Sequence, residues 1–246
     1  MRYLILSDIH SNLHALEAVL KSVRRRNFQS VLVLGDLVGY GAFPDAAVDR
    51  VRGLKKLHTI LRGNHDRVVV REGEEQAFNL PAMAAVLWTR RHLSARNIAI
   101  LRTLVPGPVR VGGFTLCHGS PVDEDQYVLS EREAWMSFEA VPTDLIFFGH
   151  SHVPCVFALE HGRVEAFLVA EPHVHLSLKR GVRYLINPGS VGQPRDGNPD
   201  ASFCIYDDRR RAVTFFRVPY DVAAAQEAIL KAGLPPNLAH RLALGR

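Results

Sequence analysis

The stretch Met1–Asp36, MRYLILSDIHSNLHALEAVLKSVRRRNFQSVLVLGD, decides the fold. An apolar run at Tyr3–Leu6 is followed by a polar loop, by apolar residues that recur every three to four positions between Leu13 and Val23, and by a second apolar run at Val31–Leu34. These patterns are typical of a strand, an amphipathic helix and a strand buried on both faces. The stretch therefore predicts a β-α-β unit with parallel strands and a right-handed crossover.

The alternation continues toward the C-terminus. Pro44 begins a second predicted helix that ends near Gly53, and Leu57–Leu61 is a weaker third strand. Residues 74–104 indicate mainly helix, with a break at Pro81. Beyond residue 108 the pattern favours a sheet built largely of hairpins, with one helical insertion at Glu131–Glu139. We expect an α/β first half and a mixed-sheet second half.

Short β-type runs fill the second half. They are Val109–Val111, Phe114–Cys117, Leu145–Phe148, Val153–Ala158, Val164–Val169, Tyr184–Asn187, Ser202–Tyr206 and Ala212–Val218. From about residue 221 an alanine- and leucine-rich tail splits into two short helices at Gly233-Leu234-Pro235-Pro236. Because the chain has no repeat or linker, we expect a single domain over residues 1–246 with a short helical tail.

Composition excludes several classes of protein. Of the 246 residues 47% are apolar, and 30 Lys and Arg against 25 Asp and Glu leave a net charge of +5, which does not by itself indicate nucleic-acid binding. Three scattered cysteines (Cys117, Cys155 and Cys204) argue against a disulfide framework and favour a reduced, cytoplasmic setting. The first apolar run is too short for a signal peptide, and no run approaches the length of a membrane span.

Histidine is the unusual residue, with 12 copies, and five of them fall in motifs that follow predicted strands. The motifs are Asp8-Ile9-His10, Gly35-Asp36, Gly63-Asn64-His65-Asp66, His118-Gly119 and Gly149-His150-Ser151-His152. Carboxyl ends of strands meet at one edge of an open α/β sheet, so these side chains are expected to converge. Imidazole and carboxylate ligands suit Mn, Fe, Ni or Zn, and a pair of such ions can act on a phosphoryl group.

In this order the five motifs resemble the signature of the calcineurin-like metallophosphoesterases. The resemblance implies a four-layer αββα sandwich of two mixed β-sheets flanked by helices. It implies that Asp8, His10 and His152 hold one divalent metal ion, that Asn64, His118 and His150 hold the other, and that Asp36 bridges the two. It also implies that His65 lies outside the metal ligands and acts as general acid or stabilises the transition state. Asp66 has a weaker, orienting role.

Two loops refine the resemblance. The protein phosphatases of this superfamily have Gly-Asp-x-Val-Asp-Arg-Gly where this chain has Gly35-Asp36-Leu37-Val38-Gly39-Tyr40-Gly41. The missing acidic residue and arginine argue against protein phosphatase and diadenosine tetraphosphate hydrolase activity. The loop Asn187–Gly192 instead resembles that of small prokaryotic members, several of which act on phosphodiesters.

The expected activity is therefore hydrolysis of a small, nucleotide-derived phosphodiester by in-line attack of a metal-bridging hydroxide. Phosphomonoesters, dinucleoside polyphosphates or phosphoproteins are alternative substrates for the same site. A non-catalytic scaffold of the same fold is disfavoured because His65 and all seven ligands are present. Nucleic acid is a less favoured partner because the basic residues are dispersed, and no membrane partner is expected.

Several residues keep two interpretations. Arg67, Arg183 and Arg195 could bind a substrate phosphate, Arg195 most attractively, although surface salt bridges explain most arginines equally well. The acidic run Asp123-Glu124-Asp125 predicts a solvated loop, and Trp88 a core residue. The other seven histidines are expected to serve packing or the surface. They are His14, His58, His92, His161, His173, His175 and His240.

Overall fold

The apolar runs of the first half form the centre of one β-sheet in the computed structural model, which describes residues 1–246. The spatial order of this first sheet is β3 (Leu57–Ile60), β2 (Ser30–Val33), β1 (Arg2–Leu6), β11 (Ala201–Asp207), β12 (Ala212–Val218) and β9 (His173–Ser177). The pairs β1–β2 and β2–β3 are parallel, as the sequence predicts, whereas β11, β12 and β9 join antiparallel.

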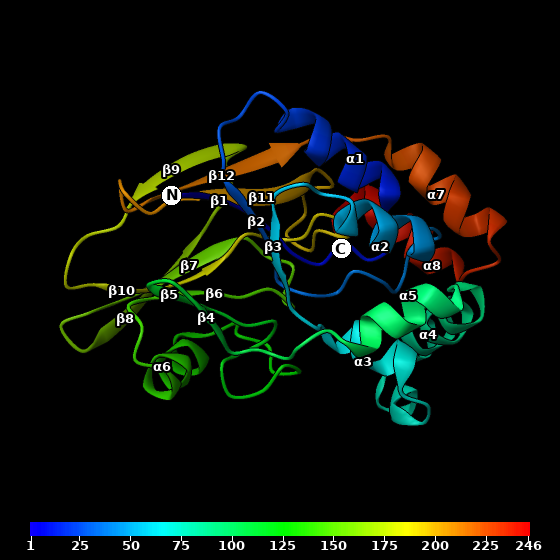
Figure 1. Cartoon of the computed structure of the whole chain (residues 1–246), viewed down its shortest axis with the longest axis horizontal. Helices are drawn as coiled ribbons and strands as arrows, with labels where there is room; N and C mark the ends of the chain where they lie inside the picture. Colours follow the sequence, from blue (N-terminus) through cyan, green and yellow to red (C-terminus); the bar gives the residue numbers. More distant parts are fainter.

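The second sheet also has six strands and faces the first (Figure 1). Its order is β4 (Val109–Val111), β5 (Phe114–Leu116), β6 (Leu145–Phe147), β10 (Arg183–Asn187), β7 (Cys155–Glu160) and β8 (Arg163–Leu168). The prediction of one hairpin-rich sheet is wrong in two respects. First, β6 pairs in parallel with both β5 and β10. Second, β11 returns to the free edge of β1, where Leu4 lies opposite Ile205, and so satisfies the backbone groups of that buried edge.

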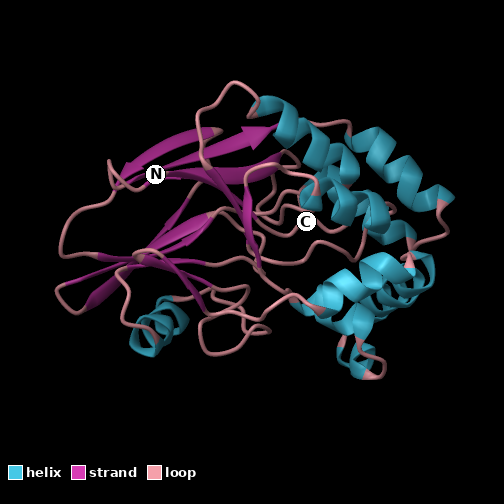
Figure 2. Cartoon of the chain, viewed as in Figure 1, coloured by secondary structure: helices cyan, strands magenta, loops and turns pink.

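Alternation along the strands builds the layers. On β1, Leu4 and Leu6 belong to the core beneath the helices, whereas Ile5 lies in the core between the two sheets. Helices α1 (Leu13–Ser22) and α2 (Pro44–Arg52) cover the outer face of the first sheet, and α6 (Glu131–Ala140) covers that of the second (Figure 2). The order helix, sheet, sheet, helix confirms the predicted four-layer sandwich.

The remaining helices pack beside the first sheet (Figure 1). They are α3 (Asn64–Val70), the short 3-10 helix Glu74–Ala77, α4 (Leu80–His92), α5 (Ala95–Arg102), α7 (Val222–Lys231) and α8 (Pro236–Leu244). The two tail helices confirm the prediction for the C-terminal segment, and α7 and α8 share an apolar cluster with Tyr40. The break that Pro81 signals lies between the 3-10 helix and α4, and Pro81 itself is in the first turn of α4, where its missing N–H costs nothing.

None of these helices combines the length and the apolar character that a membrane span needs. All three cysteines are free and buried, as expected for a chain without a disulfide framework.

Candidate functional site

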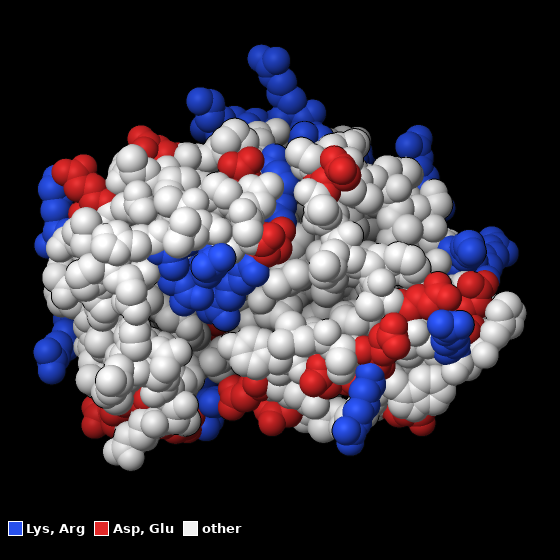
Figure 3. Space-filling view, turned by 180° about the vertical axis from the view of Figure 1, so that it is seen from behind, with Lys and Arg blue, Asp and Glu red and all other residues white.

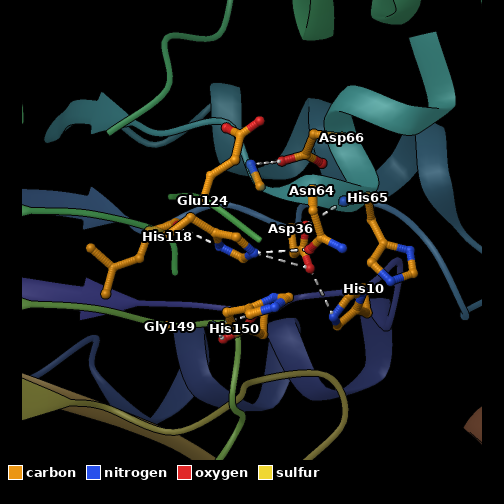
Figure 4. A network of polar contacts seen from close by, with 12 residues as sticks. His10, Asp36, Asn64, His65, Asp66, His118, Glu124, Gly149 and His150 are labelled. Atoms are coloured by element: carbon orange, nitrogen blue, oxygen red, sulfur yellow. Dashed lines mark hydrogen bonds and ion pairs between the residues drawn. The ribbon is translucent and has the colours of Figure 1, made fainter. Parts of the chain in front are cut away.

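The predicted site residues converge at one edge of the sandwich, where five strands end (Figure 4). Each motif directly follows one of β1, β2, β3, β5 and β6, so the chain delivers five short loops to the same place. All eight side chains are buried. They are Asp8, His10, Asp36, Asn64, His65, His118, His150 and His152. A buried concentration of carboxylates and imidazoles is costly unless the groups are paired or coordinate an ion.

The first group of possible metal ligands comprises Asp8, His10, Asp36 and His152, whose ligand atoms lie within 4.8 Å of one another. The Nε2 atoms of His10 and His152 are 3.0 Å apart. Their Nδ1 atoms lie 3.0 Å from the carbonyl of Val38 and 2.6 Å from that of Gln193, to which each Nδ1–H donates. Both Nε2 atoms therefore carry lone pairs that face each other, an arrangement that a cation between them would stabilise.

The second group comprises Asp36, His118 and His150. His118 donates from Nδ1 to the carbonyl of Leu34 at 2.9 Å, so its Nε2, 3.1 Å from Asn64 Oδ1, is the atom available to a cation. His150 places Nε2 3.0 Å from the carbonyl of Asp125, which leaves Nδ1 available.

Asp36 joins the two groups. Its Oδ2 atom is buried, accepts no hydrogen bond, and lies 3.4 Å from the Nε2 atoms of both His10 and His118. Its other oxygen accepts a hydrogen bond from the backbone N–H of His65 at 2.9 Å. A buried carboxylate oxygen without a partner, set between two clusters of nitrogen ligands, fits a group that two divalent ions share.

Burial also sets the protonation of the site. Burial lowers the pKa of His10 and His152 well below the usual value, and lowers that of His150 to about 3. These imidazoles are neutral at pH 7, the form that binds metals. Burial raises the pKa of Asp8 to about 6.

Asp36 and His118 form the coupled pair at the centre. Burial acts to raise the pKa of Asp36, but the neighbouring imidazoles, His118 first, outweigh it and lower that pKa. Burial acts to lower the pKa of His118, but Asp36 outweighs it and raises that pKa to about 10. A bound divalent cation would take the place of the proton that Asp36 favours on His118.

The loops hold these side chains through strained backbone. Asp8, His10, Asp36, His150 and His152 all have left-handed conformations, with φ between 48° and 62°. Residues other than glycine rarely adopt this region, and the cost is of order 1–3 kcal/mol each. Such strain is typical of functional sites, where the surrounding structure over-determines the geometry.

Three residues of the α3 motif have different surroundings. Asp66 points away from the two ligand groups and accepts hydrogen bonds from the backbone N–H groups of Gly63 (3.0 Å) and Val38 (3.2 Å), so it positions two site loops. His65 belongs to neither group, and its buried Nδ1 has no hydrogen-bond partner. Asn64 contacts His118, as above.

The loop Asn187–Gly192 supports two of the ligand loops through hydrogen bonds. Asn187 donates to the carbonyl of Gly149 (2.7 Å), and Ser190 donates to the carbonyl of Asp8 (2.8 Å). A Cβ atom at Gly192 would overlap the carbonyl of Ile9, so only glycine fits this close approach. The loop that supports the family resemblance therefore has a positioning role for the first and last ligand loops.

A cavity of about 270 Å³ opens above the ligands. Its lining includes Asp36, Asn64, His65, Tyr40, Tyr127 and Arg195. Neither tyrosine belongs to the site residues predicted from the sequence. Tyr40 could have been found, because it stands between Gly39 and Gly41 in a quoted motif, whereas nothing local marks Tyr127.

The other two candidate arginines have partners within the protein. Arg67 also lines the cavity, but it forms ion pairs with Glu74, Glu124 and Asp125. Arg183 donates to backbone carbonyls at Val141 and Thr143 and does not line the cavity. The prediction of a solvated acidic loop is wrong for Glu124, whose side chain is 9% exposed because it also pairs with Arg62. Trp88 is half-buried rather than a core residue.

Comparisons with known proteins agree with this geometry. The family model for the calcineurin-like phosphoesterase superfamily domain matches residues 1–210. An uncharacterized protein of Methanocaldococcus jannaschii is 38% identical over 98% of this chain and 97% of its own. The crystal structure of a metallophosphoesterase from Sphaerobacter thermophilus is 38% identical, with a TM-score of 0.88 and full coverage of both chains. Phosphodiesterase YfcE of Escherichia coli is 24% identical over 85% of this chain and 88% of its own. The chain belongs to the calcineurin-like phosphoesterase superfamily.

Proposed function

We propose that this phosphoesterase hydrolyses phosphodiesters with the help of two divalent metal ions. The observation that carries the proposal is Asp36 Oδ2, a buried carboxylate oxygen without a hydrogen-bond partner between two groups of imidazoles. Asp8, His10 and His152 would hold one ion, and Asn64, His118 and His150 the other, with Asp36 shared. When bound, the ions would supply positive charge to the phosphoryl oxygens and would acidify water.

The protein's own groups act around this centre. The side-chain amide of Asn64 can donate to a phosphoryl oxygen as charge develops on it. Burial lowers the pKa of His65 to about 4, so its imidazole is neutral at pH 7. A neutral imidazole can still donate an N–H hydrogen bond to the leaving oxygen, which favours stabilisation of the leaving group over transfer of a proton from imidazolium.

Two findings support a diester over a monoester. The relative YfcE is named a phosphodiesterase, and the chain lacks the acidic residue and arginine of the protein phosphatase motif, with Gly39 and Tyr40 in their place. A phosphomonoester is the alternative substrate for the same site. A non-catalytic scaffold would have no need to keep His65 together with every metal ligand.

Nucleic acid stays a less favoured substrate. On the face in Figure 3, acidic and basic side chains are interspersed, with one compact basic group beside a hollow. Extended binding to a phosphate backbone requires a continuous basic track. The free, buried cysteines support the expectation of a cytoplasmic protein that acts on a small substrate.

A metal-by-substrate screen tests the proposal. Purified protein is loaded with Mn, Fe, Ni or Zn and assayed on bis(p-nitrophenyl) phosphate and p-nitrophenyl phosphate. We expect faster turnover of the diester, with loss of activity in Asp36→Ala and His65→Ala. If no metal gives turnover of either ester, the enzymatic proposal is wrong. If the monoester is preferred, the diester assignment is wrong.

A further inference from the structure

Arg195 differs from four other arginines that are largely withdrawn from solvent. Arg62, Arg67, Arg90 and Arg217 each form an ion pair with a carboxylate. Arg195 forms none, although it lines the cavity beside the candidate metal ligands. A guanidinium group that is desolvated without an anion is costly, and a bound anion would offset that cost.

Neutral groups hold this guanidinium in place. Its Nη2 atom lies 3.1 Å from Gln193 Oε1 and 3.5 Å from the hydroxyl of Tyr40. The Nε atom is buried and has no hydrogen-bond partner. The backbone of Arg195 is also tied to the site, because its N–H donates to the carbonyl of His152 at 3.3 Å. The protein therefore orients Arg195, whose guanidinium group still has N–H donors without a hydrogen-bond partner.

A second cation lies nearby and adds to the charge. Helix α8 shares an apolar cluster with Tyr40 through Leu238 and Leu242, and Arg241 on the same helix donates from Nε to the backbone oxygen of Arg246 and pairs with no Asp or Glu. Burial first, and then Arg195, lower the pKa of Arg241, as expected for neighbouring cations without an anion between them. The C-terminal tail thus brings positive charge toward the cavity from beyond the segment that the family model matches.

Tyr40 contacts both Arg195 and two histidines of the site. The ring centroids of His10 and His65 lie 4.6 Å and 4.4 Å from that of Tyr40. Arg195 contacts the hydroxyl end of the same ring, with its guanidinium carbon 5.8 Å from the centroid. The guanidinium therefore lies at the hydroxyl end of a ring whose centroid is closer to the two imidazoles than to the guanidinium carbon.

We propose that Arg195 binds a second anionic group of the substrate, separate from the phosphoryl group that is cleaved. This inference rests on the proposed function and names its substrate class: a phosphodiester that also carries a terminal phosphate, such as a 5′-phosphorylated dinucleotide. Arginine suits this role because its planar donors match phosphate oxygens in pairs.

Kinetics on a matched pair of substrates test the proposal. The dinucleotide thymidylyl-thymidine is compared with and without a 5′-terminal phosphate. A charge-assisted contact predicts that the wild type favours the phosphorylated form by about 10–100-fold in kcat/KM. Arg195→Gln should remove this preference, so that the ratio of the two kcat/KM values falls to about 1, mainly through a change in the KM of the phosphorylated substrate. Arg195→Lys, which keeps the charge but not the paired donors, should retain part of the preference.

A matched control and a binding readout complete the test. Arg183→Gln alters another arginine without a carboxylate partner, outside the cavity, and should keep the full preference. Calorimetric titration of EDTA-treated protein with both dinucleotides measures binding without turnover, and the 5′-phosphate should again bind more tightly unless Arg195 is replaced.

Each contrary outcome has one meaning. If the wild type shows no preference, or if Arg195→Gln lowers kcat/KM equally for both dinucleotides, the inference is overturned while the proposed function stands. If the metal-loaded enzyme cleaves neither dinucleotide, the proposed function fails for this substrate class. The calorimetric preference then decides separately whether Arg195 binds the terminal phosphate.

Discussion

The two ends of the β-sandwich differ in the kind of side chain that they contain. At the end where β10 finishes, Asn187 joins a layer of buried polar side chains held by strained loops. At the end where β10 begins, Val182 and Tyr184 line an apolar cleft of about 570 Å³ between the sheets. The cleft extends along edge strand β8, where Phe167 and Leu168 are 52% and 77% exposed.

This difference separates the residues that stabilise the fold from the residues that we expect to carry the activity. The apolar end needs only burial, which tolerates changes of size and shape. The polar end buries carboxylates and imidazoles, so its geometry depends on backbone positions that the rest of the fold enforces. Substitutions at the two ends should therefore differ in kind as well as in size.

The largest effect is expected at Asp36. Asp36→Ala removes the carboxylate between the two imidazole groups and should lower kcat/KM by about 10³-fold, with loss of bound metal measured by mass spectrometry. The metal-free variant should stay folded, because the lost group is itself a desolvated charge. Asp144→Ala, at an exposed carboxylate that precedes β6, is the control and should keep metal and activity. Full metal content in Asp36→Ala would contradict the assignment.

The next largest effect is expected from a methyl group at Gly63. Gly63 has φ −96°, which alanine can adopt, but its Cβ would overlap the carboxylate and backbone N of Asp36. Overpacking of this kind should lower the free energy of unfolding by about 1–3 kcal/mol, measured with urea, and should weaken metal binding. Gly113→Ala meets open space and should change stability by less than about 0.5 kcal/mol. Equal stability of the two variants would show that the site loops can shift to accommodate the added methyl group at little cost in free energy.

A smaller effect is expected from the titration of His65. Its pKa of about 4 in the folded chain lies below the 6.5 of an unfolded histidine, so between these values the unfolded chain binds more protons. Stability is therefore lost as the pH falls. From pH 7 to pH 5, metal-free wild type should lose about 1–2 kcal/mol more than His65→Gln in urea unfolding. Parallel pH curves for the two proteins would mean that His65 is not held neutral by burial.

The same contrast explains what the sequence could predict. The Val31–Leu34 run and the period of Leu13–Val23 are local signals. They correctly predicted β2, α1 and the parallel pairing of β1 with β2. The five motifs could be placed at one edge because each follows a strand. Helix α3 was not predicted because its seven residues begin inside the motif that contains Asn64 and His65 and are too few to show a helical period.

Long-range pairing explains the remaining errors. Strand β9 alternates exposed His173 and His175 with half-buried Val174 and Leu176, which is the pattern of a half-buried strand, but over only five residues the signal is weak. It forms because β12 offers a free edge, which no local pattern reveals. The orphaned oxygen of Asp36 and the unpaired state of Arg195 likewise depend on neighbours from distant segments.

The smallest effect is expected in the apolar cleft. Leu168→Ser replaces a side chain that lines this cleft, is 77% exposed and lies on edge strand β8, which β7 separates from β10. Since little apolar surface is lost, the free energy of unfolding should change by less than about 0.5 kcal/mol, and kcat/KM and metal content should equal those of the wild type. A change in activity of more than twofold without loss of stability would mean that the cleft and the site are coupled through the sheets, so that folding and function would not be separate.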